Sequence, residues 1–282
     1  MPELPEVETT CRGIEPHIKG ETVKRVIIRH PKLRWDIPQQ LITDLPGLEL
    51  LAVQRRSKYM LLKFTSGKLL IHLGMSGSLR VLLQPEPVLK HDHFELVFTN
   101  GTLLRLTDPR RFGAVLWQDA GQQHPLLEKL GPEPLTDDFN VDTFIRAASH
   151  RKIAVKQFVM DNKVVVGVGN IYAAEALFAA AIHPETPVNT ISKQKFQKLV
   201  EAIKYILGAA IERGGTTLKD FVGGDGKPGY FAQELQVYGR KGQTCNLCQS
   251  ALHEIRLGQR STVYCPKCQR LAKSVAKKIT KN

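Results

Sequence analysis

Two Cys-x-x-Cys pairs near the end of the chain place the tightest constraint on its fold. Cys245 and Cys248 form the first pair, Cys265 and Cys268 form the second, and sixteen residues separate the pairs. Two such pairs can hold four thiolates tetrahedrally around one metal ion, and a shell of four sulfurs leaves no position for water. The pattern predicts one structural Zn²⁺ at these cysteines. We expect the fifth cysteine, Cys11, to be a small buried residue.

The start of the chain and its apolar runs argue against export and membrane insertion. MPELPEVETT, the first ten residues, has neither the basic segment nor the apolar segment of a secretory signal. No apolar run reaches the roughly 18 residues that a membrane span needs. We therefore expect a cytoplasmic protein with no membrane segment, in which the cysteines bind metal and form no disulfides. Nothing in the sequence indicates an oligomer, so we expect a monomer.

Positive charge is concentrated at the C-terminal end. The 282 residues carry a formal net charge of +13. Residues 238–282 contain ten Lys or Arg and one acid, which gives +9, and residues 1–237 contribute the remaining +4. A basic segment of this kind suits a nucleic acid, because neutralising phosphates releases condensed counterions. The alternative is a solvated tail that only aids solubility.

The first part of the chain is predicted to be mainly β-structure. Short segments rich in Leu and β-branched residues, several of them separated by turn sequences, favour a β-sandwich or barrel. A helix is expected before them, with Pro5 in its first turn and Glu6 and Glu8 near its positive end. The predicted strands are 21–30, 48–55, 59–64, 68–73, 93–98 and 102–107.

A change of pattern follows the linker-like stretch 130–140. Beyond it the apolar residues recur with helical spacing, up to a segment at 214–231 that holds six glycines and one proline in eighteen residues. That composition predicts a mobile loop. The fold class is therefore multidomain α+β. The expected divisions are an N-terminal domain at 1–130, a helical domain at 131–237, a zinc finger at 238–272 and a basic tail at 273–282.

Pro2 is a candidate nucleophile. If the initiator methionine is removed, its nitrogen becomes a secondary amine with a pKa near 8, against about 10.4 for lysine. A useful fraction is then unprotonated at neutral pH and can attack an electrophilic carbon. The iminium that forms acts as an electron sink, and Glu3 could move a proton beside it. The alternative is that Pro2 and Pro5 only begin a helix whose dipole the glutamates complement.

Three loops in the β-rich part mix basic, apolar and glycine residues. RRSKYM contains Lys58, HLGMSGSLR contains His72 and Met75, and TDPRRFG contains Arg110 and Phe112. A Met or Phe at a loop tip beside arginine suits a protein that wedges into a base stack while it holds phosphates. Each loop alone could equally be a solvated basic face or a side chain that covers the core.

Taken together, these features resemble the bacterial formamidopyrimidine-DNA glycosylases, a family of base-excision repair enzymes. The resemblance rests on PELPEVE, QRRSKYM, IHLGMSG, TDPRRFG, VVVGVGNIYA, GGTTLKDF, DGKPGYFAQELQVYGRKG and the finger with QRSTVYCPKC, and covers the chain to about residue 270. It implies an N-terminal β-sandwich, a helical domain with a helix–two-turns–helix motif and a C-terminal zinc finger. The implied activity is removal of oxidised purines (8-oxoguanine, formamidopyrimidines) from duplex DNA, followed by strand cleavage through β,δ-elimination.

The resemblance also implies roles for individual residues. Pro2 corresponds to the nucleophile, Glu3 to the proton donor that opens the sugar, Lys58 to the lysine of β-elimination, and Arg260 to the arginine of phosphate contact and δ-elimination. The loop 217–230 corresponds to the segment that covers the flipped base. The residues that correspond to DNA contacts are His72, Met75, His91, Arg110, Phe112, Lys152 and Asn170.

Two alternatives remain open at this point. One is an endonuclease VIII-like glycosylase for oxidised pyrimidines, although PELPEVE and TDPRRFG favour the purine enzyme. The other is a zinc-finger DNA-binding protein without catalysis. The chain departs from the family pattern in its basic tail and in the glycine pair at 223–224.

Overall fold

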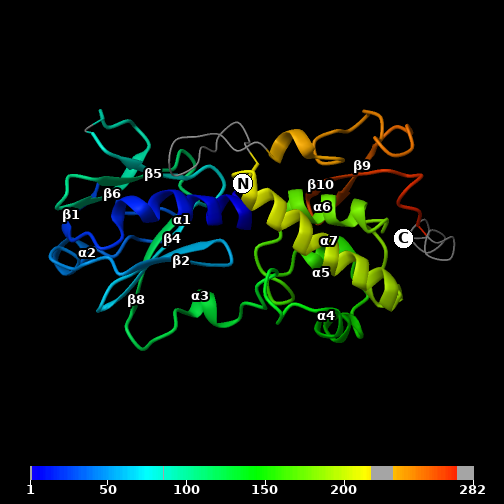
Figure 1. The fold of residues 1–282 in the computed structure, drawn as a ribbon, viewed down its shortest axis with the longest axis horizontal. Coiled ribbons are helices and arrows are strands. Elements are labelled where there is room, and N and C mark those ends of the chain that lie inside the picture. The colour runs from blue at the N-terminus through cyan, green and yellow to red at the C-terminus, as the bar shows by residue number, and fades with distance from the viewer. Residues whose placement is uncertain (1, 85, 217–230, 272–282) are drawn as a thin grey trace. The chain divides into compact units, whose positions relative to one another are not determined.

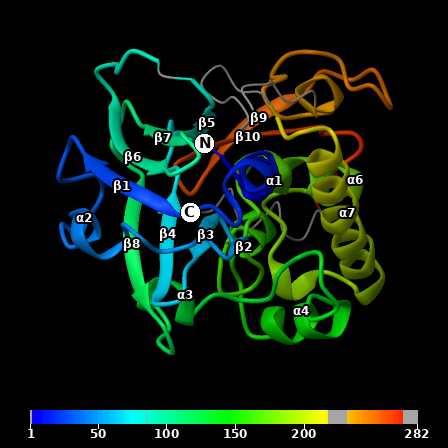
Figure 2. The same cartoon turned by 60° about the vertical axis from the view of Figure 1, so that its left-hand side comes forward.

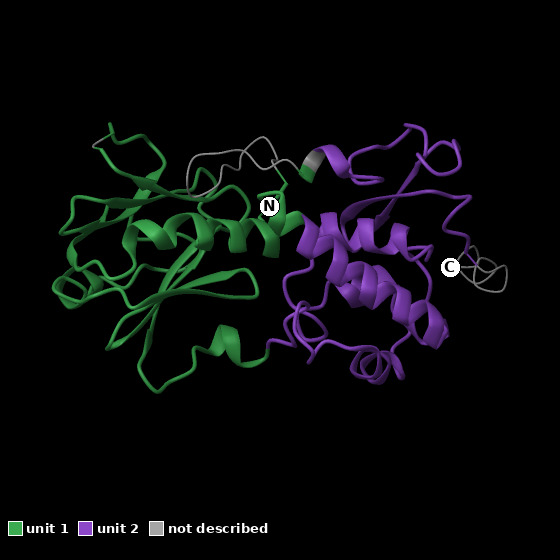
Figure 3. Ribbon diagram, viewed as in Figure 1, with its two compact units in different colours: residues 1–129, 210–232 green, residues 130–209, 233–282 purple. Residues whose placement is uncertain are grey.

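The computed structural model describes residues 2–84, 86–216 and 231–271. The chain forms two compact units, one of residues 1–129 and 210–232 and the other of residues 130–209 and 233–282 (Figure 3). The loop 217–230 and the tail 273–282 of the sequence prediction lie outside the described residues. Every helix in the described residues is too short or too polar to span a bilayer.

Helix α1 (Leu4–Ile18) opens the first unit, as the sequence predicts. Pro5 lies in its first turn, where a missing N–H costs no helical hydrogen bond. Glu3 is the N-cap residue, and its backbone N–H donates to Glu6 Oε2 at 2.8 Å, which secures the start of the helix. The buried side chains that give α1 an apolar stripe are Val7, Cys11, Ile14 and Ile18.

Two four-stranded antiparallel sheets make up most of the first unit. The strand order of one is β1 (Val23–Ile28), β6 (Asp92–Phe98), β7 (Leu103–Thr107) and β5 (Ser78–Leu82). That of the other is β2 (Ala52–Arg56), β3 (Tyr59–Lys63), β4 (Gly67–His72) and β8 (Ala114–Asp119). Helix α1 contacts β2, β3 and β5, and so touches both sheets (Figure 1). The short helices α2 (Leu41–Asp44) and α3 (Pro125–Glu128) complete the unit.

One apolar core joins α1 to both sheets. Ile14 from α1, Leu62 and Ile71 from one sheet, and Phe94 and Leu106 from the other belong to a single buried cluster. Each of these side chains is fully buried, and burying a Leu, Ile or Phe contributes about 1.5–3 kcal/mol. Two sheets that share one core form a sandwich, so the predicted fold of this part is confirmed.

Strands β5 and β8 are absent from the sequence prediction. β5 follows Gly77 directly and carries Arg80 in its centre, and β8 follows Gly113 and ends in polar residues. Both therefore look like continuations of glycine-rich loops, and only pairing with β7 and β4 makes them strands. The strand predicted at 48–55 is also shorter than expected, because β2 begins at Ala52.

The second unit is helical, again as predicted. Its helices are α4 (Val141–Ala148), α5 (Val155–Val159), α6 (Asn170–Ala179) and most of α7 (Lys193–Glu212), with 3-10 turns η1 (Val188–Thr190) and η2 (Phe231–Glu234) nearby in sequence. Phe144 of α4 packs against three other aromatic rings, those of Phe139, Phe158 and Phe196. This aromatic group joins α4, α5 and α7.

A two-stranded hairpin, β9 (His253–Leu257) and β10 (Arg260–Tyr264), connects the two cysteine pairs. Figure 2 shows the two strands side by side, and β10 contacts α6. A small buried cluster joins the finger to that helix and contains Phe178 of α6, Val263 of β10, and Cys245 and Cys265. The finger therefore packs on the helical part of its own unit.

Candidate active site and zinc site

The start of the chain is buried. Pro2 and Glu3 precede α1, and Glu3 is only 1% exposed. The carboxylate of Glu6, itself 2% exposed, accepts the Glu3 N–H at one oxygen and the Thr216 N–H at the other, both at 2.8 Å. Glu6 thus fixes Glu3 and the residue that directly precedes loop 217–230. The local sequence pattern indicates for Glu6 only a role at the helix dipole, because Thr216 lies 210 positions away in the chain.

Lys58 lies in the two-residue turn between β2 and β3. Ser57 beside it has φ of 54°, a left-handed conformation that its neighbours must stabilise. Arg55 supplies that support, since its guanidinium donates to the Ser57 carbonyl at 2.9 Å and to Glu8 of α1 at 2.8 Å. The turn that carries Lys58 is therefore tied to the helix that follows Pro2.

His72 is held in its neutral form. Burial, together with the positive charges of Lys58 and Arg34, lowers its pKa to about 4. Its Nδ1 accepts the Gly74 N–H at 2.9 Å, so the ring proton of the neutral imidazole lies on Nε2. His72 can therefore donate a hydrogen bond to a phosphate but does not contribute a positive charge.

The predicted wedge residues come from two neighbouring loops. Met75 lies between β4 and β5, and Arg110 and Phe112 lie between β7 and β8. Met75 is 40% exposed and Phe112 is 46% exposed, so both apolar side chains are accessible from solvent. The Arg110 guanidinium lies 4.7 Å from the centre of the Phe112 ring. The structure therefore brings these three residues onto one pair of exposed loops, and half-exposed His91 lies just before β6.

Three further predicted contact residues belong to the second unit. Asn170 is the first residue of α6, Arg260 is the first of β10, and Lys152 is exposed just before α5. Asn170 Nδ2 donates to the carbonyl of Ser261, beside Arg260, at 3.1 Å. Asn170 and the β10 strand therefore meet, whereas no hydrogen bond or ion pair links Lys152 to either of them in the described residues.

Lys156 holds this contact in place, although no motif in the sequence marks it as a site residue. It is 1% exposed, and its Nζ donates to Asn170 Oδ1 at 2.7 Å and to Thr262 Oγ1 at 2.6 Å. A buried ammonium is tolerated only when its protons are bound in this way. Beside it lies a pocket of about 210 Å³ that Lys156 and Arg260 help to line.

The four finger cysteines meet at one point. Cys245 Sγ lies 3.9 Å from Cys268 Sγ, Cys248 Sγ lies 3.4 Å from Cys265 Sγ, and all four sulfurs lie within 4.8 Å of one another. Tetrahedral zinc with Zn–S bonds of about 2.3 Å requires sulfurs about 3.8 Å apart. Four thiols at this spacing fit one structural Zn²⁺, and the predicted cofactor is confirmed.

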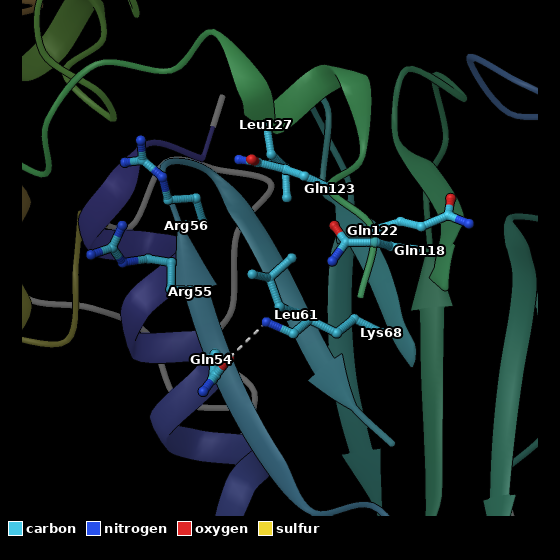
Figure 4. A pocket seen from close by; sticks show the side chains of 9 residues that line it. All are labelled: Gln54, Arg55, Arg56, Leu61, Lys68, Gln118, Gln122, Gln123 and Leu127. Atoms are coloured by element: carbon cyan, nitrogen blue, oxygen red, sulfur yellow. Dashed lines mark hydrogen bonds between the residues drawn. The ribbon is translucent and has the colours of Figure 1, made fainter. Parts of the chain in front are cut away.

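A larger hollow lies on the face of the β2-β3-β4-β8 sheet, and none of the predicted site residues lines it. Its volume is about 700 Å³, with Leu61 at its floor and Leu127 of α3 at its rim (Figure 4). Lys68 donates to Gln54 across one side at 3.4 Å. Its other lining residues are Arg55, Arg56, Gln118, Gln122 and Gln123.

Family models match nearly the whole chain. Residues 1–115 match the formamidopyrimidine-DNA glycosylase N-terminal domain, and residues 130–222 match the H2TH domain of the same enzyme. Residues 242–271 match the zinc finger found in FPG and IleRS. The boundaries expected from the sequence itself, at 130, 237 and 272, stay predictions.

Individual relatives match over the same length. The formamidopyrimidine-DNA glycosylase of Stutzerimonas stutzeri is 59% identical over 270 residues, which cover 96% of this chain and all of the relative. The crystal structure of MutM (FPG) from Thermus thermophilus is 36% identical with a TM-score of 0.86, and covers 96% of this chain and 100% of that one.

A second solved structure contains damaged DNA. It is the complex between wild-type Lactococcus lactis Fpg (MutM) and a DNA containing N7-benzyl-Fapy-dG. The protein is 33% identical, with a TM-score of 0.89 over 96% of this chain and 100% of that one. Fold, zinc module and whole-length identity agree with the family expected from the motifs. The chain therefore belongs to the formamidopyrimidine-DNA glycosylase family and is a DNA glycosylase and AP lyase of base-excision repair.

Proposed function

We propose that this enzyme removes 8-oxoguanine and formamidopyrimidines from duplex DNA through a Schiff base on Pro2. The observation that carries the proposal is the buried Pro2–Glu3 pair at the positive end of α1, which Glu6 holds by its hydrogen bond to the Glu3 N–H. A secondary amine and a carboxyl group fixed side by side provide a nucleophile and a proton carrier. Removal of Met1, which exposes the Pro2 amine, is part of the proposal.

In the first stage the nitrogen of Pro2 replaces the damaged base at C1′ of the sugar. The nitrogen of Pro2 attacks C1′ of the damaged nucleotide, and the bond from C1′ to the base nitrogen breaks. The base leaves with that electron pair and takes up the proton that the Pro2 nitrogen loses. Glu3 donates a proton to the ring oxygen of the sugar, so that the C1′–O4′ bond breaks and a positively charged iminium remains between C1′ and Pro2.

The second stage cleaves the strand. The iminium draws electrons from C1′, so a proton leaves C2′, with Lys58 as the proposed carrier, and the 3′ phosphate departs. A second elimination releases the 5′ phosphate, with Arg260 bound to the phosphate that leaves. Water then hydrolyses the iminium and frees Pro2. The chain's own residues carry each step, and the zinc supplies only the shape of the finger.

Both units provide residues for DNA binding in this proposal. Met75, Arg110 and Phe112 fill the space that the flipped nucleotide vacates and contact the opposite base. Neutral His72 donates to a phosphate, and the remaining proposed backbone contacts are His91, Lys152 and Asn170. Because the substrate is chromosomal DNA, the proposal places the enzyme in the cytoplasm with the chromosome. The proposal also includes a monomeric state.

Glu3→Gln tests the assigned chemistry. The amide keeps the shape of Glu3 but cannot donate the proton, so single-turnover excision of 8-oxoguanine should fall by about 10²–10⁴-fold. Borohydride trapping at a preformed abasic aldehyde, where no sugar ring needs to be opened, should persist. Glu15→Gln on the exposed side of α1 is the matched control and should behave as wild type. Equal excision rates for Glu3→Gln and wild type would overturn the role of Glu3.

The lesion class has its own test. Excision of 8-oxoguanine opposite cytosine should exceed excision of thymine glycol under the same single-turnover conditions. The reverse order would favour the endonuclease VIII-like alternative. Binding to both duplexes with cleavage of neither would leave the non-catalytic zinc-finger protein as the better description.

A further inference from the structure

Asp108 is a buried acid at the base of the loop that carries Arg110 and Phe112. Its side chain is 0% exposed, and it lies outside the residues proposed for chemistry and for DNA contact. A carboxylate removed from water is destabilising unless hydrogen-bond donors replace the water. The donors that Asp108 binds therefore show what this residue does.

The two oxygens of Asp108 bind two different loops. Oδ2 accepts the N–H of Gly113, at the far end of its own loop, at 2.7 Å. Oδ1 accepts the hydroxyl of Ser76, in the loop between β4 and β5, at 3.0 Å. Ser76 Oγ in turn accepts the N–H of Arg110 at 3.3 Å. A continuous chain of hydrogen bonds thus runs from Gly113 through Asp108 and Ser76 to Arg110.

The same two loops also touch through their backbones. Gly74 has φ of +62°, and a Cβ placed on it would lie 2.4 Å from the carbonyl carbon of Phe112. A Cβ on Gly113 would lie 2.7 Å from the His72 carbonyl oxygen. Only glycine permits so close an approach at these positions. The two loops are therefore packed backbone to backbone, with the Asp108 carboxylate as the polar link.

We propose that Asp108, acting through Ser76, is a positioning residue that joins the Met75 loop to the Arg110–Phe112 loop and thereby sets how the enzyme discriminates the base opposite the lesion. The inference rests on the proposed role of Met75, Arg110 and Phe112 in contacting that base. Three exposed side chains on two separate loops can read one base only if their mutual positions are fixed. Asp108 and Ser76 provide this fixation without contacting DNA.

Ser76→Ala is the sharpest variant. It removes the hydrogen-bonded link between the loops but leaves their backbone packing and the bond from Asp108 to Gly113 in place. Ser76 is only half-buried, so the fold should persist. The measured quantity is the ratio of single-turnover excision rates for 8-oxoguanine opposite cytosine and opposite adenine. We expect this ratio to fall about tenfold, the factor that corresponds to one lost hydrogen bond to a charged group.

Two more variants should change the ratio of excision rates by different amounts. Asp108→Ala removes both bonds and should reduce the ratio further than Ser76→Ala does. Asp108→Asn keeps the shape, because its oxygen can accept from Gly113 and its amide can donate to Ser76, and should retain most of the ratio. Ser66→Ala, at the exposed turn between β3 and β4, removes an equal hydroxyl and should leave the ratio unchanged.

A second readout separates positioning from general damage and from failure of the proposed function. Borohydride trapping at an abasic site in single-stranded DNA involves no opposite base, so all the variants should trap as wild type does. An unchanged base ratio in Ser76→Ala and Asp108→Ala, with trapping intact, overturns this inference and leaves the proposed function standing. No trapping by wild type overturns the proposed function itself.

Discussion

The sandwich loops and the finger hairpin are held by different means, although both carry residues proposed to contact DNA. The loops of Met75 and Phe112 project from a unit with an extensive apolar core shared by α1 and both sheets. The finger has a small buried cluster that includes two of the zinc-binding cysteines. The sandwich can therefore fold whether or not its loops bind DNA. The finger depends on zinc both for its fold and for the position of the hairpin that carries Arg260. A substitution in the sandwich loops should therefore change the specificity of the enzyme, whereas a comparable substitution in the finger should change its structure.

Zinc removal should have the largest effect and should be confined to the finger. Chelation, or Cys265→Ser, should reduce strand cleavage at least about 100-fold, because so small a module does not fold without its metal. Hydrogen exchange should rise across residues 242–268 while the strands of the sandwich stay protected. Cys11→Ala, at a cysteine buried in the sandwich, is the control and should keep one zinc per chain. Full strand cleavage by metal-free protein would show that the finger does not need zinc to fold and act.

Loss of the buried ammonium of Lys156 should have the next largest effect. Lys156→Met keeps the apolar stem but leaves Asn170 Oδ1 and Thr262 Oγ1 without a donor, at a cost of about 2 kcal/mol in the free energy of unfolding. DNA affinity should fall as well, since Asn170 and the Arg260 strand lose their common support. Lys198→Met on the exposed face of α7 should change neither quantity. If Lys156→Met has the same stability and DNA affinity as this control, the hairpin does not depend on the Lys156 ammonium.

Protonation of His72 should have the smallest effect at neutral pH, because the ring is neutral there. Its pKa in the folded protein is about 4, below the 6.5 of an ordinary histidine, so the unfolded chain binds the proton more tightly. The contribution of His72 to stability is therefore complete above pH 6.5 and is lost as the pH falls towards 4. A titration of the imidazole resonances by NMR should give a midpoint near 4, and a midpoint near 6.5 would contradict the buried, neutral assignment.

The sequence predicted the elements that local patterns encode. The cysteine spacing located the metal site, and Pro5 with the following apolar stripe located α1. The period of apolar residues separated the β-rich part from the helical part. These features depend on near neighbours in sequence, and they could be predicted for that reason.

Long-range partners could not be predicted in the same way. Glu6, Asp108 and Lys156 look like ordinary surface charges in the sequence, yet all three are almost completely buried. Their roles depend on Thr216, Ser76 and Thr262, which lie from about 30 to more than 200 positions away. Short strands such as β5 were missed for a related reason, since pairing with β7 defines them.

Borohydride trapping with peptide mapping tests the central claim most directly. The enzyme is incubated with a duplex that contains one 8-oxoguanine opposite cytosine, the imine is reduced, and the cross-linked peptide is identified by mass spectrometry. The account predicts one adduct, on the nitrogen of Pro2 in a chain that has lost Met1. An adduct on Lys58 instead, or robust excision by protein that retains Met1, would contradict it.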